Sequence, residues 1–235
     1  MKTLFLSAAV AVVSLASCTA QAQVKQSRQL SGFQTVSSSG GIDLVLSQGS
    51  TTSVVVEASP EAQDHIVTEV DGNALKIGWE RNYSWRDLLS SKRKATVYIT
   101  CPRLIGLSLS GGSDAKGQSN FSADNFSIDA SGGSDVKMNL TAKTLTVQAS
   151  GGSDVDLAGR VERQKVDVSG GSDYNGFALQ SNTATVQASG GSDVNVFVEG
   201  EISSNASGGS DIRYKGGARV ANSSSGGGGS VRRVE

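Results

Sequence analysis

The pentapeptide Ser110-Gly111-Gly112-Ser113-Asp114 decides the fold, because it recurs five more times without a mismatch. The other copies occupy residues 131–135, 150–154, 169–173, 189–193 and 207–211. Successive copies begin 18 to 21 residues apart, and residues 225–229 resemble a decayed seventh copy in which Gly229 replaces the aspartate. Self-similarity at a near-fixed period of this size is typical of a solenoid.

The segments between the copies alternate apolar and polar residues, as half-buried strands do. Leu145, Val147 and Ala149 precede the third copy, and Val155 and Leu157 follow it. A coil of about 20 residues at about 3.3 Å per residue is far too long for one hairpin arm. The sequence therefore predicts an all-β fold, a single-stranded right-handed parallel β-helix over residues 105–231, followed by a short tail, 232–235.

Residues 33–104 form a mixed N-terminal part in this interpretation. Ile42, Leu44 and Leu46 share one face of a strand. Ser59-Pro60-Glu61 is a helix-start signature, which predicts a short helix over residues 60–70. Cys101 falls on the apolar face of a later strand, where it is expected to fill the core.

The first 22 residues have the pattern of an export signal, with Lys2 ahead of a short apolar run. Two processing alternatives remain open. Ala20-Gln21-Ala22 fits cleavage before Gln23, whereas Leu15-Ala16-Ser17-Cys18 resembles a bacterial lipobox, which makes Cys18 a lipidation candidate and the only expected contact with a membrane. Residues 23–32 are polar and are predicted to be a tether.

Composition narrows the classes of function. The formal net charge is −1, which gives no reason to expect a nucleic acid as partner. The chain has a single histidine, His65, which argues against a multi-histidine metal site or a histidine-dependent triad.

The repeated corner has a structural explanation and leaves one binding question. Gly-Gly permits a sharp bend, and Ser and Asp cap it by bonding to nearby backbone N–H groups. Six stacked carboxylates repel one another unless they face solvent, bind N–H groups or share a cation such as Ca²⁺. The candidate row for a ligand or a cation is Asp114, Asp135, Asp154, Asp173, Asp193 and Asp211.

Catalysis has little support in the sequence, and we expect no enzyme and no required cofactor. No phosphate-binding loop, zinc signature or nucleophile elbow occurs. Asp154, Asp156 and Arg160 could be combined into a polysaccharide-cleaving site, but any repeat with one aspartate per coil produces such groupings. The basic and aromatic segment 80–94 is interpreted as a long hairpin loop, with contact to a sugar or an anionic surface as the alternative.

Several stretches resemble one known family, the "putative auto-transporter adhesin, head GIN domain" family, DUF2807. The resemblance covers about residues 33–231. It is carried by residues 41–49, 73–77 and 97–104, by the serial Ser-Gly-Gly-Ser-Asp corners, and by Tyr214-Lys215-Gly216. The resemblance implies a right-handed β-helix at the bacterial cell envelope and implies no established activity.

The sequence thus predicts an exported cell-envelope protein of adhesin type, whose regular faces bind a glycan or a protein and which performs no catalysis. A purely structural envelope protein and a polysaccharide-active β-helix enzyme are the two alternatives. Because a fold does not fix a function, this prediction rests on analogy.

Overall fold

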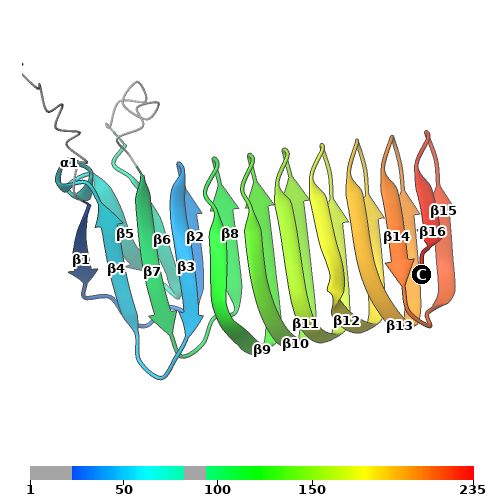
Figure 1. Ribbon diagram of the computed structural model, residues 1–235, viewed down its shortest axis with the longest axis horizontal. Coiled ribbons are helices and arrows are strands. Elements are labelled where there is room, and N and C mark those ends of the chain that lie inside the picture. Colours follow the sequence, from blue (N-terminus) through cyan, green and yellow to red (C-terminus); the bar gives the residue numbers. More distant parts are fainter. Residues whose placement is uncertain (1–22, 82–93) are drawn as a thin grey trace, which may run out of the picture.

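The computed structural model describes residues 23–81 and 94–235. The leader with Cys18, and residues 82–93 of the basic and aromatic segment, lie outside the described residues. The described chain forms one elongated solenoid of parallel, stacked coils (Figure 1). Each coil runs down the front of this view, bends at the lower edge, returns up the back and reverses at a tight corner on the upper edge. Because the chain advances from left to right as it does so, the solenoid is right-handed, and the predicted fold is confirmed.

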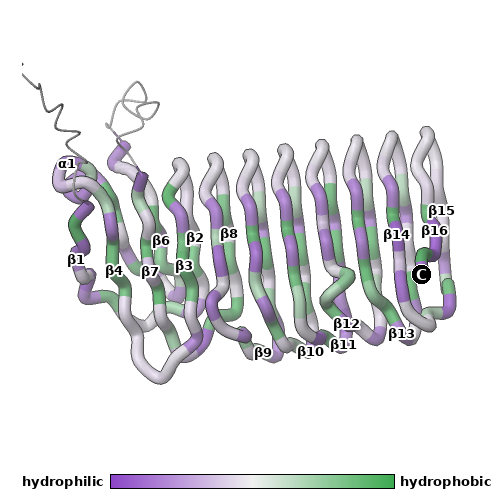
Figure 2. The backbone as a smooth tube through the Cα atoms, in the orientation of Figure 1, coloured by the Kyte–Doolittle hydropathy of each residue, from purple (hydrophilic) through white to green (hydrophobic). Residues whose placement is uncertain are grey.

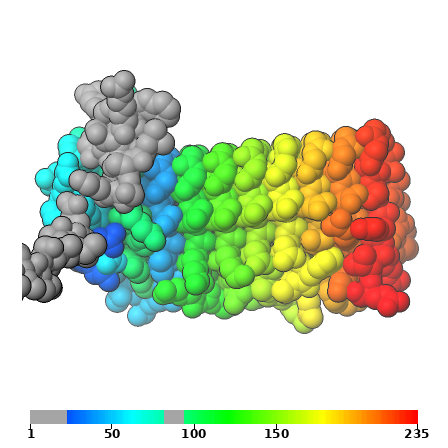
Figure 3. All heavy atoms as spheres, turned by 45° about the horizontal axis from the view of Figure 1, so that its top comes forward, coloured from blue at the N-terminus to red at the C-terminus, as the bar shows by residue number. Residues whose placement is uncertain are grey.

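Each central strand is a whole coil long and bends in the middle. These strands are β9 (Ala115–Ser131), β10 (Val136–Ser150), β11 (Asp154–Val168), β12 (Asp173–Ala188) and β13 (Asp193–Ala206). Neighbouring strands pair in parallel with almost no offset, so that Val147 lies beside Val166 and Val166 beside Val186. Side chains at equivalent positions therefore form straight rows along the axis, which are visible as aligned ribs in Figure 3.

The core is a narrow band between the front and back sheets. Buried residues of β10 alternate with exposed or half-exposed ones on either side of the bend at Lys143 and Thr144, and Leu140, Leu145 and Val147 are fully buried. Figure 2 shows the same alternation along the coils. Cys101 is buried in this core, as predicted, and burial raises the pKa of its thiol. The small, β-branched composition of the chain suits a core that is only two side chains thick.

The first coil in sequence is not the first coil in space. β2 (Thr35–Ser39) and β3 (Ile42–Gln48) pair in parallel with β8 (Gly106–Ser110) and β9 on one side. On the other side they pair in parallel with β6 (Ala74–Trp79) and β7 (Ala95–Cys101). The chain thus enters the solenoid one coil inside its end, builds the end, and returns at β8. The predicted boundary at residue 105 is therefore wrong, since the stacked coils include residues 35–48.

The N-terminal end of the solenoid is closed by antiparallel strands. β4 (Ser53–Ala58) pairs with β7, and β1 (Val24–Arg28) pairs with β4. The predicted tether over residues 23–32 is therefore wrong in part. Polar residues form a strand here because β1 takes up the free backbone edge of β4, and Lys25 forms an ion pair with Glu57 at 3.5 Å.

The helix predicted over residues 60–70 is also corrected. α1 spans only Pro60–Gln63, with Ser59 as its N-cap. From Ile66 the chain forms β5 (Ile66–Asp71), which pairs antiparallel with β6 across the turn at Gly72. Alternating β-branched residues favour a strand over a helix once a partner strand lies alongside. Ile66 and Val70 are four residues apart, a spacing that fits the period of a helix as well as that of a strand.

The C-terminal coil is formed by β14 (Asp211–Lys215), β15 (Arg219–Ser225) and β16 (Ser230–Arg233). β15 pairs with β13, and β16 pairs with β14. Two residues of the predicted tail therefore belong to a strand. In the described residues, no helix is long and apolar enough to cross a membrane.

Pairing also shows the true register of the outermost repeats. Ser39 lies beside Ser110, so residues 39–43 are a further copy of the corner in which Ile42 replaces the second serine. At the other end, Ser225 pairs with Ala206 and Ser230 with Asp211. The decayed copy is therefore 226–230, one residue later than predicted, with Ser230 in place of the aspartate.

We predict that alanine is tolerated less well at the first glycine of a corner than at the second. Both Gly132 (φ +67°) and Gly133 (φ +76°) have left-handed backbones, which cost a residue with a side chain about 1–2 kcal/mol. A Cβ at Gly132 would also lie 3.1 Å from the backbone nitrogen of Gly111, whereas one at Gly133 would meet nothing within 4 Å. Thermal unfolding should show a larger drop for Gly132→Ala than for Gly133→Ala. Equal drops would mean that the corners do not stack as closely as described.

Candidate functional site

The second serine of each corner is the most deeply buried polar residue of the repeat. These serines have no accessible surface; they are Ser113, Ser134, Ser153, Ser172, Ser192 and Ser210. The Ser153 hydroxyl donates to the backbone carbonyl of Ser150 in its own corner at 3.0 Å. It accepts from the backbone N–H of Ser134 in the preceding coil at 3.1 Å. The Ser153 hydroxyl therefore closes its own corner and bonds it to the corner before it. We call the row of these six residues the serine ladder.

The serine ladder ends where the sequence of the corner changes. Ser113 accepts from the backbone N–H groups of Gly41 and Ile42, both at 3.1 Å. Ile42, which replaces the serine in that corner, is fully buried. The indole N–H of Trp79 donates to the carbonyl of Gly40 at 2.8 Å, so this ring covers the outer side of the corner. An apolar residue and an aromatic ring thus terminate the row of hydroxyls.

The predicted aspartates do lie in one row, on the front face directly after the corners. The strand pairing joins Asp173 to Asp193 and Asp193 to Asp211, and the same register continues through the other three. Asp43 extends the row by one coil, because Leu44 pairs with Ala115. Sequence reasoning missed Asp43, although Ser39-Gly40-Gly41-Ile42-Asp43 carries the corner pattern with one substitution.

Backbone N–H groups hold part of this row. The carboxylate of Asp114 accepts from the N–H of Asp135 at 3.1 Å, and that of Asp173 accepts from the N–H of Asp193 at 3.1 Å. Each bond joins a side chain to the next coil. A carboxylate so bonded is stabilised in its charged form, which offsets the repulsion from its neighbours.

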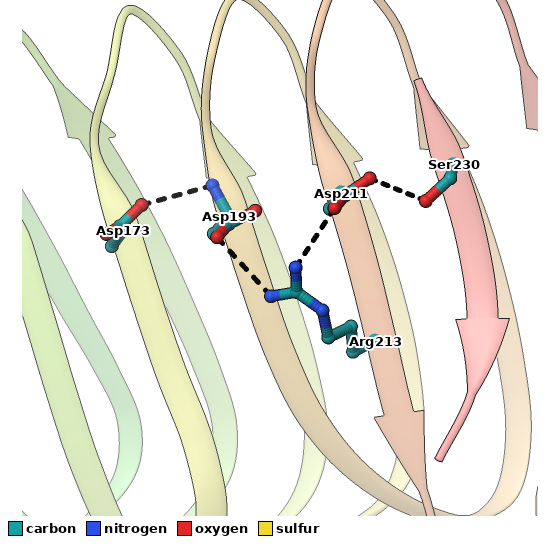
Figure 4. A network of polar contacts seen from close by, with 5 residues as sticks. All are labelled: Asp173, Asp193, Asp211, Arg213 and Ser230. Atoms are coloured by element: carbon teal, nitrogen blue, oxygen red, sulfur yellow. Dashed lines mark hydrogen bonds and ion pairs between the residues drawn. The ribbon is translucent and has the colours of Figure 1, made fainter. Parts of the chain in front are cut away.

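The guanidinium group of Arg213 bridges two carboxylates at the C-terminal end of the row of aspartates (Figure 4). Arg213 donates to Asp193 at 3.3 Å and to Asp211 at 2.9 Å, and so bridges two adjacent coils. Asp211 also accepts from the hydroxyl of Ser230 at 2.5 Å. The hydrogen bond from Ser230 and the charge of Arg213 lower the pKa of Asp211.

The N-terminal half of the row has no such bridge. Partial burial and, to a smaller extent, the negative charge of Asp114 raise the pKa of Asp43. Partial burial and the charges of Asp114 and Asp154 raise the pKa of Asp135. Lys137, which follows Asp135 on the same face, pairs instead with Asp156 at 2.7 Å. In the described residues, no group of three or more His, Cys, Asp and Glu is placed to hold a metal ion. Binding of Ca²⁺ by the row of aspartates therefore stays a prediction.

The bends opposite the corners form a groove of about 780 Å³. Its floor is a row of small side chains at paired positions, namely Ala123, Ala142, Val161 and Ser181. One rim carries Ser122, Thr141, Arg160 and Gln180. The other carries Asp124, Lys143, Glu162 and Asn182. We call this feature the bend groove.

Sequence reasoning missed the bend groove because no motif marks it. Lys143 has no partner in the strand pairing between Ala142 and Thr144, and it is exposed, as expected of a residue at a bend. The signal that could have found it is the repeat period itself. Counting back eight residues from the first serine of each following corner reaches a small or apolar residue flanked by polar ones, namely Ala123, Ala142, Val161 and Ser181.

The catalytic grouping weighed from the sequence is not assembled. Asp154 and Asp156 line a smaller hollow of about 310 Å³ beside the corners. Arg160 lines the bend groove and donates to Gln180 at 2.7 Å. The two acids and the arginine therefore face different hollows.

A right-handed β-solenoid with one invariant edge and one grooved edge defines the chain as a repeat protein with a long, regular outer surface. The model of the family described as "putative auto-transporter adhesin, head GIN domain" matches residues 32–218. The chain belongs to this family, as the sequence indicated. No curated protein matches it.

Several solved structures have a similar fold. A "putative adhesin" from Bacteroides fragilis superposes with a TM-score of 0.83 at 21% identity, covering 90% of this chain and 97% of the other. A "putative lipid binding protein" from Parabacteroides distasonis gives 0.69 at 19%, covering 91% and 97%. A "putative adhesin" from Parabacteroides merdae gives 0.64 at 16%, covering 91% and 97%. At these identities the likeness shows the fold alone.

We predict that Ser153→Ala destabilises the protein by about 1–3 kcal/mol, the cost of leaving buried backbone groups without a partner. The substitution removes the acceptor of the Ser134 N–H and the donor to the Ser150 carbonyl. Ser150→Ala is the matched control, because the side chain of Ser150 is exposed. Urea unfolding should separate the two variants. If they unfold at the same urea concentration, the serine ladder does not stabilise the stack.

We also predict opposite effects of neutralising two aspartates of the same row. The folded-state pKa of Asp135 is raised, so its charge costs stability above that pKa and the cost disappears as the pH falls below it. Asp135→Asn should therefore raise Tm at pH 7 and lose this advantage near about pH 3. The folded-state pKa of Asp211 is lowered, so its charge stabilises the protein, and Asp211→Asn should lower Tm at pH 7. Shifts of the same sign in both variants would contradict this electrostatic description.

Proposed function

We propose that this chain is an exported cell-envelope protein of adhesin type, which binds an external glycan or protein through the outer surface of its solenoid. The observation that carries the proposal is the bend groove. Stacking extends it over consecutive coils, from Gln48 to Glu199, and a continuous groove of this kind suits a long ligand.

Membership of the family supports binding at the cell surface. The geometry of the row of aspartates supports a structural role for that face, since Arg213, Ser230 and backbone N–H groups already engage its carboxylates. The groove side chains, in contrast, project from bends and vary from coil to coil. Variation on a constant scaffold is what a recognition surface requires.

The two alternatives differ in measurable ways. A purely structural envelope protein binds no external ligand. A polysaccharide-active enzyme releases shortened chains on incubation with its substrate. We expect the protein, purified without its leader, to bind at least one ligand on a glycan array or among purified envelope and matrix proteins, and to release no product. Blank results with both ligand sets would contradict the adhesin proposal, and product release that is lost in Arg160→Ala would favour the enzyme.

We further propose that Cys18 is lipidated and anchors the chain to a membrane. The motif Leu15-Ala16-Ser17-Cys18 supports this proposal. Metabolic labelling of cells with a palmitate analogue should mark the wild-type protein and leave Cys18→Ala unmarked. Cys101→Ala is the control, because that thiol is buried and should not affect labelling. A wild-type chain that stays unlabelled and begins at Gln23 would show the other processing route.

A further inference from the structure

We infer that the bend groove binds a linear, uncharged polysaccharide whose chain runs along the solenoid axis, with one sugar ring to about one coil. This inference rests on the proposed function and names its ligand. Three features support it: the charges on the two rims, the spacing between coils, and the strand backbones under the groove, which are already paired with one another.

The charges on the two rims are balanced and interleaved. Arg103, Lys143 and Arg160 are the cations of the groove lining, and Asp124, Glu162 and Glu199 are its anions. A polyanion lying along the groove would meet the three carboxylates, and a polycation would meet the three cations. Neither kind of polymer gains from the whole length of the groove, whereas an uncharged one is not repelled anywhere along it.

Several of these charged side chains already form ion pairs or hydrogen bonds within the protein. Lys143 pairs with Asp124 at 2.8 Å, and Glu199 accepts from the backbone N–H of Gly217 at 3.1 Å. Arg160 donates to the side-chain oxygen of Gln180 at 2.7 Å. These bonds orient the groups, and each keeps further donor or acceptor positions open. The amides of Gln180 and Asn182 both donate and accept, as sugar hydroxyls do.

The spacing favours a polymer of sugars over an extended peptide. Equivalent rim groups recur once per coil, about 4.8 Å apart. A peptide in β conformation repeats its side-chain direction only every two residues, at about 6.6 Å, and falls out of step with the coils. A polysaccharide linked across opposite carbons of each ring is extended and advances by nearly one coil spacing per ring. Strand addition is also excluded along this groove, because it crosses β9 to β12, whose backbones are already paired with one another.

The floor of the bend groove provides a surface on which a ligand lies and offers few hydrogen bonds to it. Ala142, Val161 and Ser181 are almost fully buried, so a ligand rests on small side chains. The hydroxyl of Ser181 accepts from Gln164 at 2.8 Å and donates to the carbonyl of Phe197 at 2.8 Å. Recognition therefore falls to the rims, and none of the groove residues that the structure describes offers an aromatic ring for stacking.

Isothermal titration of the purified chain, without its leader, tests the inference. The probes are neutral β-linked oligosaccharides of glucose, mannose and xylose, from two to eight sugars long. Oligogalacturonate and oligolysine serve as charged probes. We expect at least one neutral series to bind, with an affinity that rises with length and levels off once the groove is filled, at about 24 Å for the five spacings between its six coils.

Matched substitutions locate the binding site. Thr141→Trp places a large ring on the groove rim, and Thr185→Trp makes the same change at an exposed position of the back face. The double variant Arg160→Ala, Gln180→Ala removes two of the four polar side chains of the same rim. We expect both groove variants to bind at least about tenfold more weakly, the equivalent of about 1.4 kcal/mol, and Thr185→Trp to bind as the parent does. Circular dichroism and Tm of all variants establish that each is folded.

The outcomes separate this inference from the proposed function. Neutral glycan binding that Thr141→Trp leaves unchanged would overturn the groove assignment while the adhesin proposal stands. A preference for oligogalacturonate, oligolysine, a protein or lipid vesicles would likewise overturn the uncharged-polysaccharide assignment alone. Failure to bind any probe or purified envelope protein would overturn both.

Discussion

The structure depends on the hydrogen bonds of the serine ladder. Its buried hydroxyls bond within their own corner, as those of Ser134 and Ser192 do, or to the corner before it, as that of Ser172 does. The hydroxyl of Ser153 does both. A hydroxyl is the smallest side chain that can donate and accept at once, and this position requires both. Threonine would add a methyl group where no surface is accessible, and alanine would leave buried backbone groups unpaired. The close approach of stacked glycines then sets the distance over which the hydroxyl bonds. Corner geometry and serine chemistry therefore constrain one another, which accounts for six identical copies.

The two edges of the solenoid are constrained differently, and this difference separates stability from recognition. At the corner edge, backbone meets backbone and the residue types are fixed. At the bend edge, side chains project from a turn that any flanking residues can make. Rim residues there differ from coil to coil, while the floor stays small or apolar. A surface of this kind can change its ligand without disturbing the stack, because the coils are held together elsewhere.

The row of aspartates shows how a regular stack manages repeated charge. Equivalent carboxylates must lie about 4.8 Å apart, and their repulsion grows with every coil added. Hydrogen bonds to the next coil's N–H reduce it in part, and Arg213 neutralises it at one end. The charges of Asp43 and Asp135 remain a net cost, as the raised pKa values of these two carboxyl groups indicate. The row is therefore better explained as corner capping with a residual electrostatic cost than as a preformed metal site.

The sequence by itself determined the solenoid, its period and the residues of its corners, because these follow from a local pattern repeated at a fixed interval. It also placed Cys101 in the core and the six aspartates in one row. Only the tertiary structure decided that residues 35–48 stack inside the N-terminal end, since a parallel coil can accept neighbours from any part of the chain. The same holds for β5, which becomes a strand because β6 lies beside it. The bend groove was likewise not predictable from the sequence, because its walls come from six coils, those of β3 and of β9 to β13, and exist only once those coils are stacked in register.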